Sequence, residues 1–127
     1  MKYRVLVVDD DKFVRQWLAG MLAEQDVEAR EASNGEEALA TTEKNDLDLV
    51  LLDFDLGPGI DGLEVLRQVR EKRPDLPVVM ISGVARGGQG AEAMKLGAYD
   101  YVLKPFDVGV DAKACRVLLH AQVHHAR

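Results

Sequence analysis

Two short aliphatic runs of this 127-residue chain end in acidic residues. The run Val5–Val8 is followed by Asp9–Asp11, and the run Leu49–Leu52 is followed by Asp53. Two carboxylates ~4 Å apart repel each other by about 4 kcal/mol at an effective dielectric constant of roughly 20. A cation among them, or a proton on one of them, removes this repulsion. Ligands that are all oxygen suit Mg²⁺, Ca²⁺ or Mn²⁺, so these aspartates are candidates for a divalent metal site.

A hydroxyl and an amine follow two later apolar runs in the same way. Ser82 comes after Val78–Ile81, and Lys104 comes after a run that ends at Leu103. A metal ion and a lysine can neutralise the oxygens of a phosphoryl group while a carboxylate attacks phosphorus. Asp53 is the best candidate nucleophile, because it ends the most apolar run and lies centrally in the chain. These residue types therefore predict a phosphoryl-transfer site.

The elements that must position these side chains are short apolar runs alternating with amphipathic stretches, a pattern of β–α units. A nearly continuous apolar run such as Leu47–Leu52 is typical of a strand covered on both faces. Parallel strands all end at the same edge of their sheet, where such folds bind ligands. We therefore expect one α/β domain, a parallel sheet with helices on both faces. The expected strands are Tyr3–Val8, Val27–Ala32, Leu47–Leu52, Pro77–Ile81 and Tyr99–Leu103, and the expected helices are Lys12–Glu24, Ser33–Lys44, Gly62–Arg73, Ala91–Leu96 and one beginning at Asp107.

Several helix ends are expected from local signals. Asp11 is expected to cap the helix that follows it, and Ser33 with Glu36 forms an S-x-x-E capping box. Gly97 is expected to end the fourth helix. The stretch Gly87–Gly90 contains three glycines, each costing a helix ~1 kcal/mol relative to alanine, so that helix is expected to start late, near Ala91, or to have a mobile first turn. The stretch is either a soft switch element or simply a flexible loop.

Composition excludes other classes of protein. Hydrophobic residues make up 47% and charged residues 30%, which is ordinary for a globular domain and argues against disorder. The net charge of −6 argues against binding to nucleic acid or an anionic membrane. The aliphatic runs are far shorter than the ~20 residues of a membrane helix, and the first residues lack the apolar stretch of a signal peptide. Cys115 is the only cysteine, so no internal disulfide is expected. We expect a cytoplasmic location.

Four segments together resemble the receiver domain of two-component response regulators. They are VLVVDDD (Val5–Asp11), LVLLDFD (Leu49–Asp55), VVMISG (Val78–Gly83) and AMKLGAYDYVLKPF (Ala93–Phe106), in the family's order and with similar spacing. The resemblance implies one receiver domain over residues 1–127 with a flavodoxin-like, doubly wound (βα)5 fold. It also implies a five-stranded parallel sheet in the order 2-1-3-4-5. The first and third strands would then be neighbours, which would bring their terminal aspartates together.

The resemblance implies roles for the acidic residues. Asp53 matches the phosphoacceptor, which takes a phosphoryl group from a phosphohistidine. Asp10 matches the acid that binds Mg²⁺ directly, and Asp9 matches its neighbour, which usually acts through a metal-bound water. The carboxylate of Asp53 and the backbone carbonyl of Asp55 would complete the ligand set, and Mn²⁺ could replace Mg²⁺.

The resemblance also implies how the remaining site residues act. Ser82, Gly83 and Lys104 would bind the phosphoryl group. Ser82 and Tyr101 would form the switch, with the aromatic side chain changing rotamer when the hydroxyl moves. Pro105 would have a structural role, since family members commonly hold this proline in a cis peptide.

The partners implied by the resemblance are a sensor histidine kinase or a histidine phosphotransfer protein. The first helix would dock that donor. The fourth helix, fifth strand and fifth helix would form the signalling face, through which family receivers often form homodimers. The domain would bind neither nucleic acid nor membrane, and its only catalytic property would be slow autodephosphorylation. The cognate kinase and the effector are left open.

Departures from the family pattern leave alternatives open. The segment Asp53–Gly62 is one residue longer than the family's D-x-x-M/L-P-x-x-D-G, which suggests a looser loop beside the metal. The run Leu51–Asp55 also looks like the DxD motif of haloacid-dehalogenase-like phosphatases, although the pair Asp9 and Asp10 precedes it. A flavodoxin-like flavin binder would share the fold, but three aspartates after the first strand would repel a phosphate. The third alternative is a receiver-like binding module that is never phosphorylated.

Overall fold

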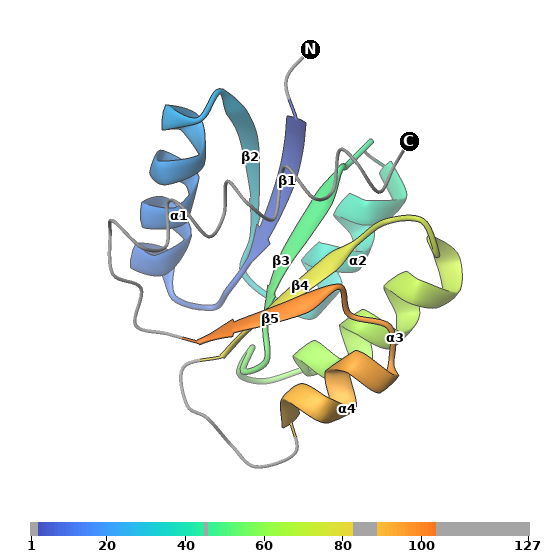
Figure 1. The fold of residues 1–127 in the computed structure, drawn as a ribbon. Coiled ribbons are helices and arrows are strands. Elements are labelled where there is room, and N and C mark those ends of the chain that lie inside the picture. The colour runs from blue at the N-terminus through green and yellow to red at the C-terminus, as the bar shows by residue number, and fades with distance from the viewer. Residues whose placement is uncertain (1–2, 45, 83–88, 104–127) are drawn as a thin grey trace.

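A computed structural model of the chain describes residues 3–44, 46–82 and 89–103 (Figure 1). The helix expected from Asp107 lies outside these residues, as do three expected site residues: Gly83, Lys104 and Pro105. The described strands are β1 (Tyr3–Val8), β2 (Val27–Ala32), β3 (Leu49–Asp53), β4 (Val78–Ser82) and β5 (Asp100–Leu103), and the described helices are α1 (Lys12–Glu24), α2 (Gly35–Lys44), α3 (Gly62–Lys72) and α4 (Gln89–Lys95). Most boundaries agree with the expected ones to within one or two residues.

The five strands form one parallel sheet in the order β2-β1-β3-β4-β5, which confirms the expected topology. In the register of β1 with β3, Val8 lies opposite Leu52. The two strands therefore end within one residue of the same level, and Asp9, which follows β1, lies beside Asp53, the last residue of β3.

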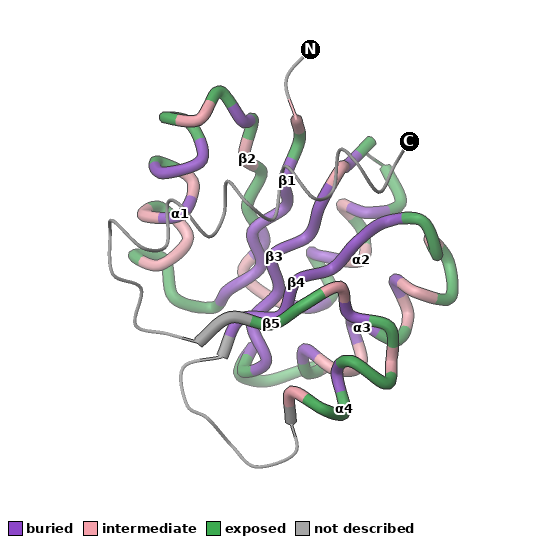
Figure 2. The backbone as a smooth tube through the Cα atoms, in the orientation of Figure 1, coloured by how far each residue is buried: buried purple, intermediate pink, exposed green. Residues whose placement is uncertain are grey.

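Alternate residues of the central strands fill two separate cores, one on each face of the sheet. Leu6 of β1 and Val50 of β3 belong to the core beneath α2, α3 and α4, whereas Val5 and Leu49 belong to the core beneath α1. Figure 1 shows α1 on one side of the sheet and the other three described helices on the opposite side. Both faces are buried, as Figure 2 shows in purple for β1, β3 and β4. This two-sided burial explains the nearly unbroken apolar run in β3.

Two of the expected helix ends are confirmed. The Asp11 carboxylate caps α1, where its Oδ1 accepts hydrogen bonds from the backbone amides of Phe13 at 2.9 Å and Val14 at 3.4 Å. Gly97 has a φ of +100° after the end of α4. The hydrogen bonds from the amides of Gly97 to Met94 (3.1 Å) and of Ala98 to Ala93 (3.0 Å) form a Schellman motif.

The expected capping box at Ser33 and Glu36 is wrong by one residue. Asn34 caps α2: its Oδ1 accepts a hydrogen bond from the amide of Glu37 at 2.8 Å. The Glu37 carboxylate accepts hydrogen bonds in return from Asn34 Nδ2 at 3.1 Å and from the Ser33 hydroxyl. Asparagine caps a helix as well as serine does, so the sequence offers two overlapping cap candidates. The contacts of Glu36 with the loop after β3, described below, favour Asn34.

Helix α4 begins at Gln89, two residues before the start expected near Ala91. The ring of Tyr101 lies directly on Gly90, where an added Cβ would be 2.8 Å from the ring atoms Cε1 and Cζ. The glycine lets the ring pack closely on the first turn of α4, which partly offsets its low helix propensity. In the described part of the chain, no helix has the length and apolar character needed to cross a membrane.

Candidate functional site

Three aspartates form an acidic cluster at the edge of the sheet where β1 and β3 end. Asp9, Asp10 and Asp53 each offer one carboxylate oxygen, and these oxygens all lie within 4.8 Å of one another. The cluster follows directly from the sheet order, because β1 and β3 are neighbours and end within one residue of the same level. The donor set is all oxygen, which fits Mg²⁺, Ca²⁺ or Mn²⁺.

Two of the three carboxylates are buried and held by backbone amides. Asp9 is 1% exposed and Asp53 is 4% exposed, whereas Asp10 is exposed to solvent. Asp9 Oδ1 accepts a hydrogen bond from the amide of Asp11 at 2.9 Å. Asp53 Oδ1 accepts one from the amide of Asp55 at 3.1 Å. Hydrogen bonds from amides to a carboxylate stabilise its charged form and fix its orientation.

Arg15 supports the acidic cluster from α1. Its Nη1 donates a hydrogen bond to the backbone carbonyl of Asp9 at 2.6 Å, and its Nε donates one to Glu31 at 3.2 Å. The side chain is 14% exposed, so α1 and β2 hold the guanidinium beside the end of β1. The sequence carried no distinctive signal for this role, because an arginine on a helix is usually a solvated surface residue.

The start of α3 lies against the backbone of Asp53. A Cβ added at Gly62 would be 2.2 Å from the carbonyl oxygen of Asp53 and 2.8 Å from the Cα of Phe54. The amide of Gly62 donates a hydrogen bond to the carbonyl of Phe54 at 3.2 Å, and Asp61 caps α3. The absence of a side chain at Gly62 therefore lets α3 begin in contact with the end of β3, the strand that carries Asp53.

The loop after β3 is anchored on both sides of its glycines. Leu56 is 3% exposed and belongs to the core beneath α2, α3 and α4. The amide of Ile60 donates a hydrogen bond to Glu36 Oε1 at 3.2 Å. Between these anchors, Gly57 and Gly59 have positive φ values of +73° and +102°. The contact between Ile60 and Glu36 joins residues 24 positions apart, so no local signal in the sequence pointed to it.

The other expected site residues are placed as follows. Ser82 ends β4, next to β3, with its backbone one residue beyond the partner of Asp53 in the register. Tyr101 lies in β5 and is 44% exposed. The structure thus brings Asp9, Asp10 and Asp53 together, with the loop residue Asp55 bonded to Asp53.

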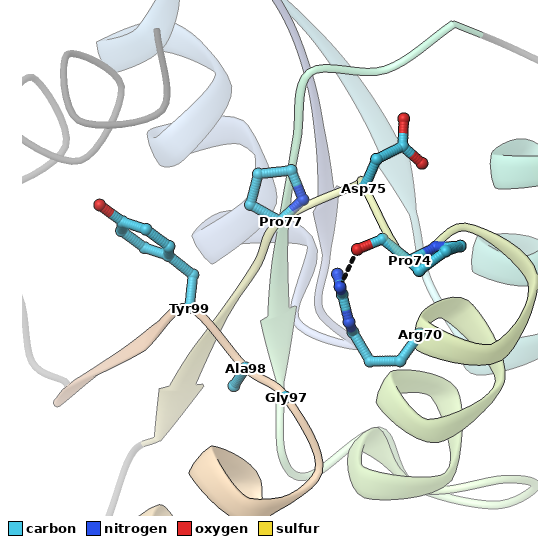
Figure 3. A pocket seen from close by; sticks show the side chains of 7 residues that line it. All are labelled: Arg70, Pro74, Asp75, Pro77, Gly97, Ala98 and Tyr99. Carbon is cyan, nitrogen blue, oxygen red and sulfur yellow. Dashed lines mark hydrogen bonds between the residues drawn. The ribbon is translucent and has the colours of Figure 1, made fainter. Parts of the chain in front are cut away.

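A separate hollow of about 270 Å³ lies at the opposite edge, where β4 and β5 begin. Its lining includes Arg70, Asp75 and Tyr99 (Figure 3). The Arg70 guanidinium donates hydrogen bonds to the backbone carbonyls of Pro74 and Leu76. This arginine therefore closes the turn between α3 and β4.

The chain matches the family model for the response regulator receiver domain over residues 5–114. It is 40% identical over 117 residues to a protein-glutamate methylesterase/protein-glutamine glutaminase of Trichodesmium erythraeum, covering 89% of this chain and 33% of that protein. It is 38% identical over 103 residues to the transcriptional regulatory protein ResD of Bacillus subtilis, covering 81% of this chain and 42% of ResD. The chain thus spans less than half the length of these curated relatives.

Solved structures of receiver domains have the same fold. A CheY-like response regulator receiver domain protein from Methanospirillum hungatei superposes with a TM-score of 0.90 at 27% identity, covering 98% of each chain. The receiver domain of NtrX from Brucella abortus superposes with a TM-score of 0.84 at 36% identity, covering 91% of this chain and 98% of that one.

These similarities favour a receiver over the phosphatase, flavin-binding and phosphorylation-independent alternatives. Receiver domains of response regulators have a phosphorylation-dependent role in two-component signalling, and they generally signal rather than catalyse. The match over residues 5–114, the five-stranded sheet and the acidic cluster agree with one another. This chain belongs to the response regulator receiver domain family.

Proposed function

We propose that Asp53 accepts a phosphoryl group from a phosphohistidine on a sensor histidine kinase or a histidine phosphotransfer protein. The observation that carries this proposal is the acidic cluster, in which the buried Asp53 lies with Asp9 and Asp10 at one edge of the sheet. Burial among other carboxylates is unfavourable for an aspartate without a cation nearby, so the position of Asp53 favours a bound cation beside it.

The chain offers a ligand set for Mg²⁺ at this edge. We assign the carboxylates of Asp9, Asp10 and Asp53 and the backbone carbonyl of Asp55 to it, with Asp9 acting through a water. A bound Mg²⁺ would neutralise the acids and the oxygens of the incoming phosphoryl group.

The chain's own contribution to the transfer is orientation and charge. A carboxylate oxygen of Asp53 forms a bond to phosphorus as the phosphorus–nitrogen bond of the donor breaks, and the electron pair of that bond stays on the imidazole. The amide of Asp55, bonded to Asp53 Oδ1, fixes the rotation of the carboxylate for this attack. The product is an acyl phosphate, which water hydrolyses slowly back to the carboxylate.

Phosphorylation adds a charge of about −1.5 to −2 at Asp53. We assign the binding of this charge to Ser82, Gly83 and Lys104, and the resulting switch to Ser82 and Tyr101. The switch then shifts the population of two states of the domain. The family resemblance supports these roles, and it also supports a structural role for Pro105.

The kinase or phosphotransfer protein has to cover the rim of the acidic cluster to reach Asp53. Phe13 is 82% exposed and follows Asp11, the cap of α1, by two residues. We assign this first turn of α1 to the surface that the phosphodonor covers. We assign signalling and homodimerisation to the surface of α4, β5 and the segment after β5, where Met94 is 46% exposed. The proposed setting is the cytoplasm.

Intact-mass spectrometry after incubation with acetyl phosphate and Mg²⁺ tests this proposal. One added phosphoryl group is expected on the wild-type chain, and none on Asp53→Asn or without metal. Because fast hydrolysis would hide the adduct, phosphate release is measured in the same samples. If neither an adduct nor release that depends on Asp53 is found, the domain is not a phosphorylation switch.

A further inference from the structure

The loop between β3 and α3 has a composition that is costly to order. Residues 54–61 include Gly57 and Gly59, both at positive φ, and the segment is one residue longer than the family pattern. Glycines lose more conformational freedom on folding than other residues do. Yet this loop carries Asp55, whose amide is bonded to Asp53. Something must therefore hold the loop in place.

We propose that Glu36 is a positioning residue for the metal site, acting through this loop. Glu36 Oε1 accepts a hydrogen bond from the amide of Ile60 at 3.2 Å. The same carboxylate lies flat against Gly59, where an added Cβ would be 2.8 Å from Oε1 and 3.1 Å from Oε2. One side chain from α2 thus fixes two successive residues of the loop.

Glu36 projects from a rigid base. It lies in the first turn of α2, which Asn34 caps. Its neighbour Gly35 is buried beneath Ile60, where an added Cβ would be 2.4 Å from the Cγ1 of that side chain. The hydrogen bond of Glu36 and the packing of Gly35 therefore act on the same residue, Ile60.

The fixed loop touches two members of the acidic cluster. Its first part holds Asp53 through the amide of Asp55. Its middle part lies beside Asp10, because an added Cβ at Gly57 would be 3.6 Å from Asp10 Oδ2. Displacement of Gly59 and Ile60 would therefore move the backbone beside Asp10, and it would leave Leu56 as the one described anchor that holds the Asp55 carbonyl. This inference rests on the proposed metal site.

Two substitutions separate position from charge. Glu36→Gln removes the negative charge and keeps a carbonyl oxygen that accepts the Ile60 hydrogen bond. Glu36→Ala removes both. If Glu36 positions the loop, Glu36→Ala weakens Mg²⁺ binding about 10-fold, as is usual for residues that support metal ligands, and Glu36→Gln stays near wild type. If Glu36 acts only by its charge, the two variants weaken binding equally.

The experiment is isothermal titration of Mg²⁺ into the wild-type chain, both variants and the control Glu71→Ala. Glu71 is another exposed acid, whose carboxylate is 70% exposed on α3. The proposal is overturned if Glu36→Ala binds Mg²⁺ as wild type does, or if both Glu36 variants weaken binding equally. Should Glu36→Ala fail to fold in a urea titration, Glu36→Leu, which keeps a side chain of similar bulk but has no hydrogen-bond acceptor, is expected to weaken Mg²⁺ binding in its place.

Hydrogen exchange in the metal-free protein gives a second readout. The amides of Ile60 and Asp55 are expected to exchange faster in Glu36→Ala than in the wild type, with Glu36→Gln close to wild type. If the wild-type chain binds no Mg²⁺, the proposed metal site fails. Faster exchange in Glu36→Ala then still supports the role of Glu36 in holding the loop, and unchanged exchange overturns it.

Discussion

At the scale of single residues, the contact between α3 and β3, the strand that ends in Asp53, depends on one glycine. Gly62 lies so close to the backbone of Asp53 and Phe54 that a Cβ would overlap both residues. Those neighbours are backbone atoms of the strand that carries Asp53, so they cannot move away without moving the candidate acceptor.

Gly62→Ala is expected to lower the free energy of unfolding by about 2 kcal/mol or more, the usual cost of forcing extra volume into a packed site. It should also slow phosphorylation by acetyl phosphate, because relief of the overlap shifts Asp53. Urea unfolding and the rate of adduct formation measure the two effects.

Gly20→Ala is the matched control for this substitution. An added Cβ at Gly20 meets no atom within 4 Å. The residue lies within α1, away from its ends, and is exposed to solvent. Alanine there should raise the free energy of unfolding by roughly 0.5–1 kcal/mol and leave phosphorylation unchanged. Equal effects at the two positions would contradict the close contact at Gly62.

At the scale of elements, the start of α2 shows how a local signal can be displaced by one residue. Both Ser33 with Glu36 and Asn34 with Glu37 have the spacing of a capping box. Asn34 forms the cap, and Glu36 instead accepts a hydrogen bond from the loop after β3. Sequence spacing could not choose between them, because the choice depends on a partner in another element.

Asn34→Ala should therefore lower the free energy of unfolding by about 1 kcal/mol, the typical cost of losing a helix cap. Ser33→Ala should cost less, because the Ser33 hydroxyl bonds only the Glu37 side chain among the hydrogen bonds described for it. Thermal or urea unfolding of the two variants measures the difference. A larger cost at Ser33 would restore the capping box expected from the sequence.

At the scale of the whole molecule, we expect the acidic cluster to make the free energy of unfolding depend on a bound metal ion. Three carboxylate oxygens within 4.8 Å of one another repel in the folded chain and separate when it unfolds. A cation that binds only the folded chain stabilises it by mass action, by about 2.7 kcal/mol at a concentration 100 times its dissociation constant.

Asp10→Asn is expected to raise the stability of the metal-free protein, because it removes one charge from the cluster. The same change should remove most of the stabilisation by Mg²⁺. Urea unfolding of both proteins in EDTA and in Mg²⁺ measures these opposite effects. The assignment of Asp10 as a metal ligand would be wrong if Mg²⁺ stabilised the variant as strongly as it stabilises the wild type.

Recognition of a phosphodonor is also a property of the whole surface. Phe13→Ala is expected to slow phosphotransfer from a purified histidine kinase about 10-fold, as is usual when an exposed aromatic anchor is lost. Purified histidine kinases are first screened for phosphotransfer to the wild-type domain, and a kinase that phosphorylates it is used for this comparison. The rate with acetyl phosphate should be unchanged, because this small donor does not need the α1 surface.

Glu24→Ala shortens an exposed side chain at the other end of α1, away from the acidic cluster, and serves as the control. It should leave both rates unchanged. Equal slowing in the two variants would contradict a docking role specific to Phe13.

The sequence by itself determined the elements and the candidate chemistry. Apolar periodicity identified the strands and helices, because burial on one or both faces is written into local spacing. The aspartates after Val8 and Leu52 were identifiable because parallel strands present their ends at one edge. The sheet order came from the family resemblance, and the structure confirms it.

Only the tertiary structure decided which contacts hold these residues in place. Glu36 meets Ile60 across 24 positions of the chain, and Tyr101 packs on Gly90 of another element. The close approach of Gly62 to Asp53 likewise depends on the angle at which α3 leaves the sheet. Such contacts arise from the packing of whole elements against one another, so no local pattern of residues encodes them.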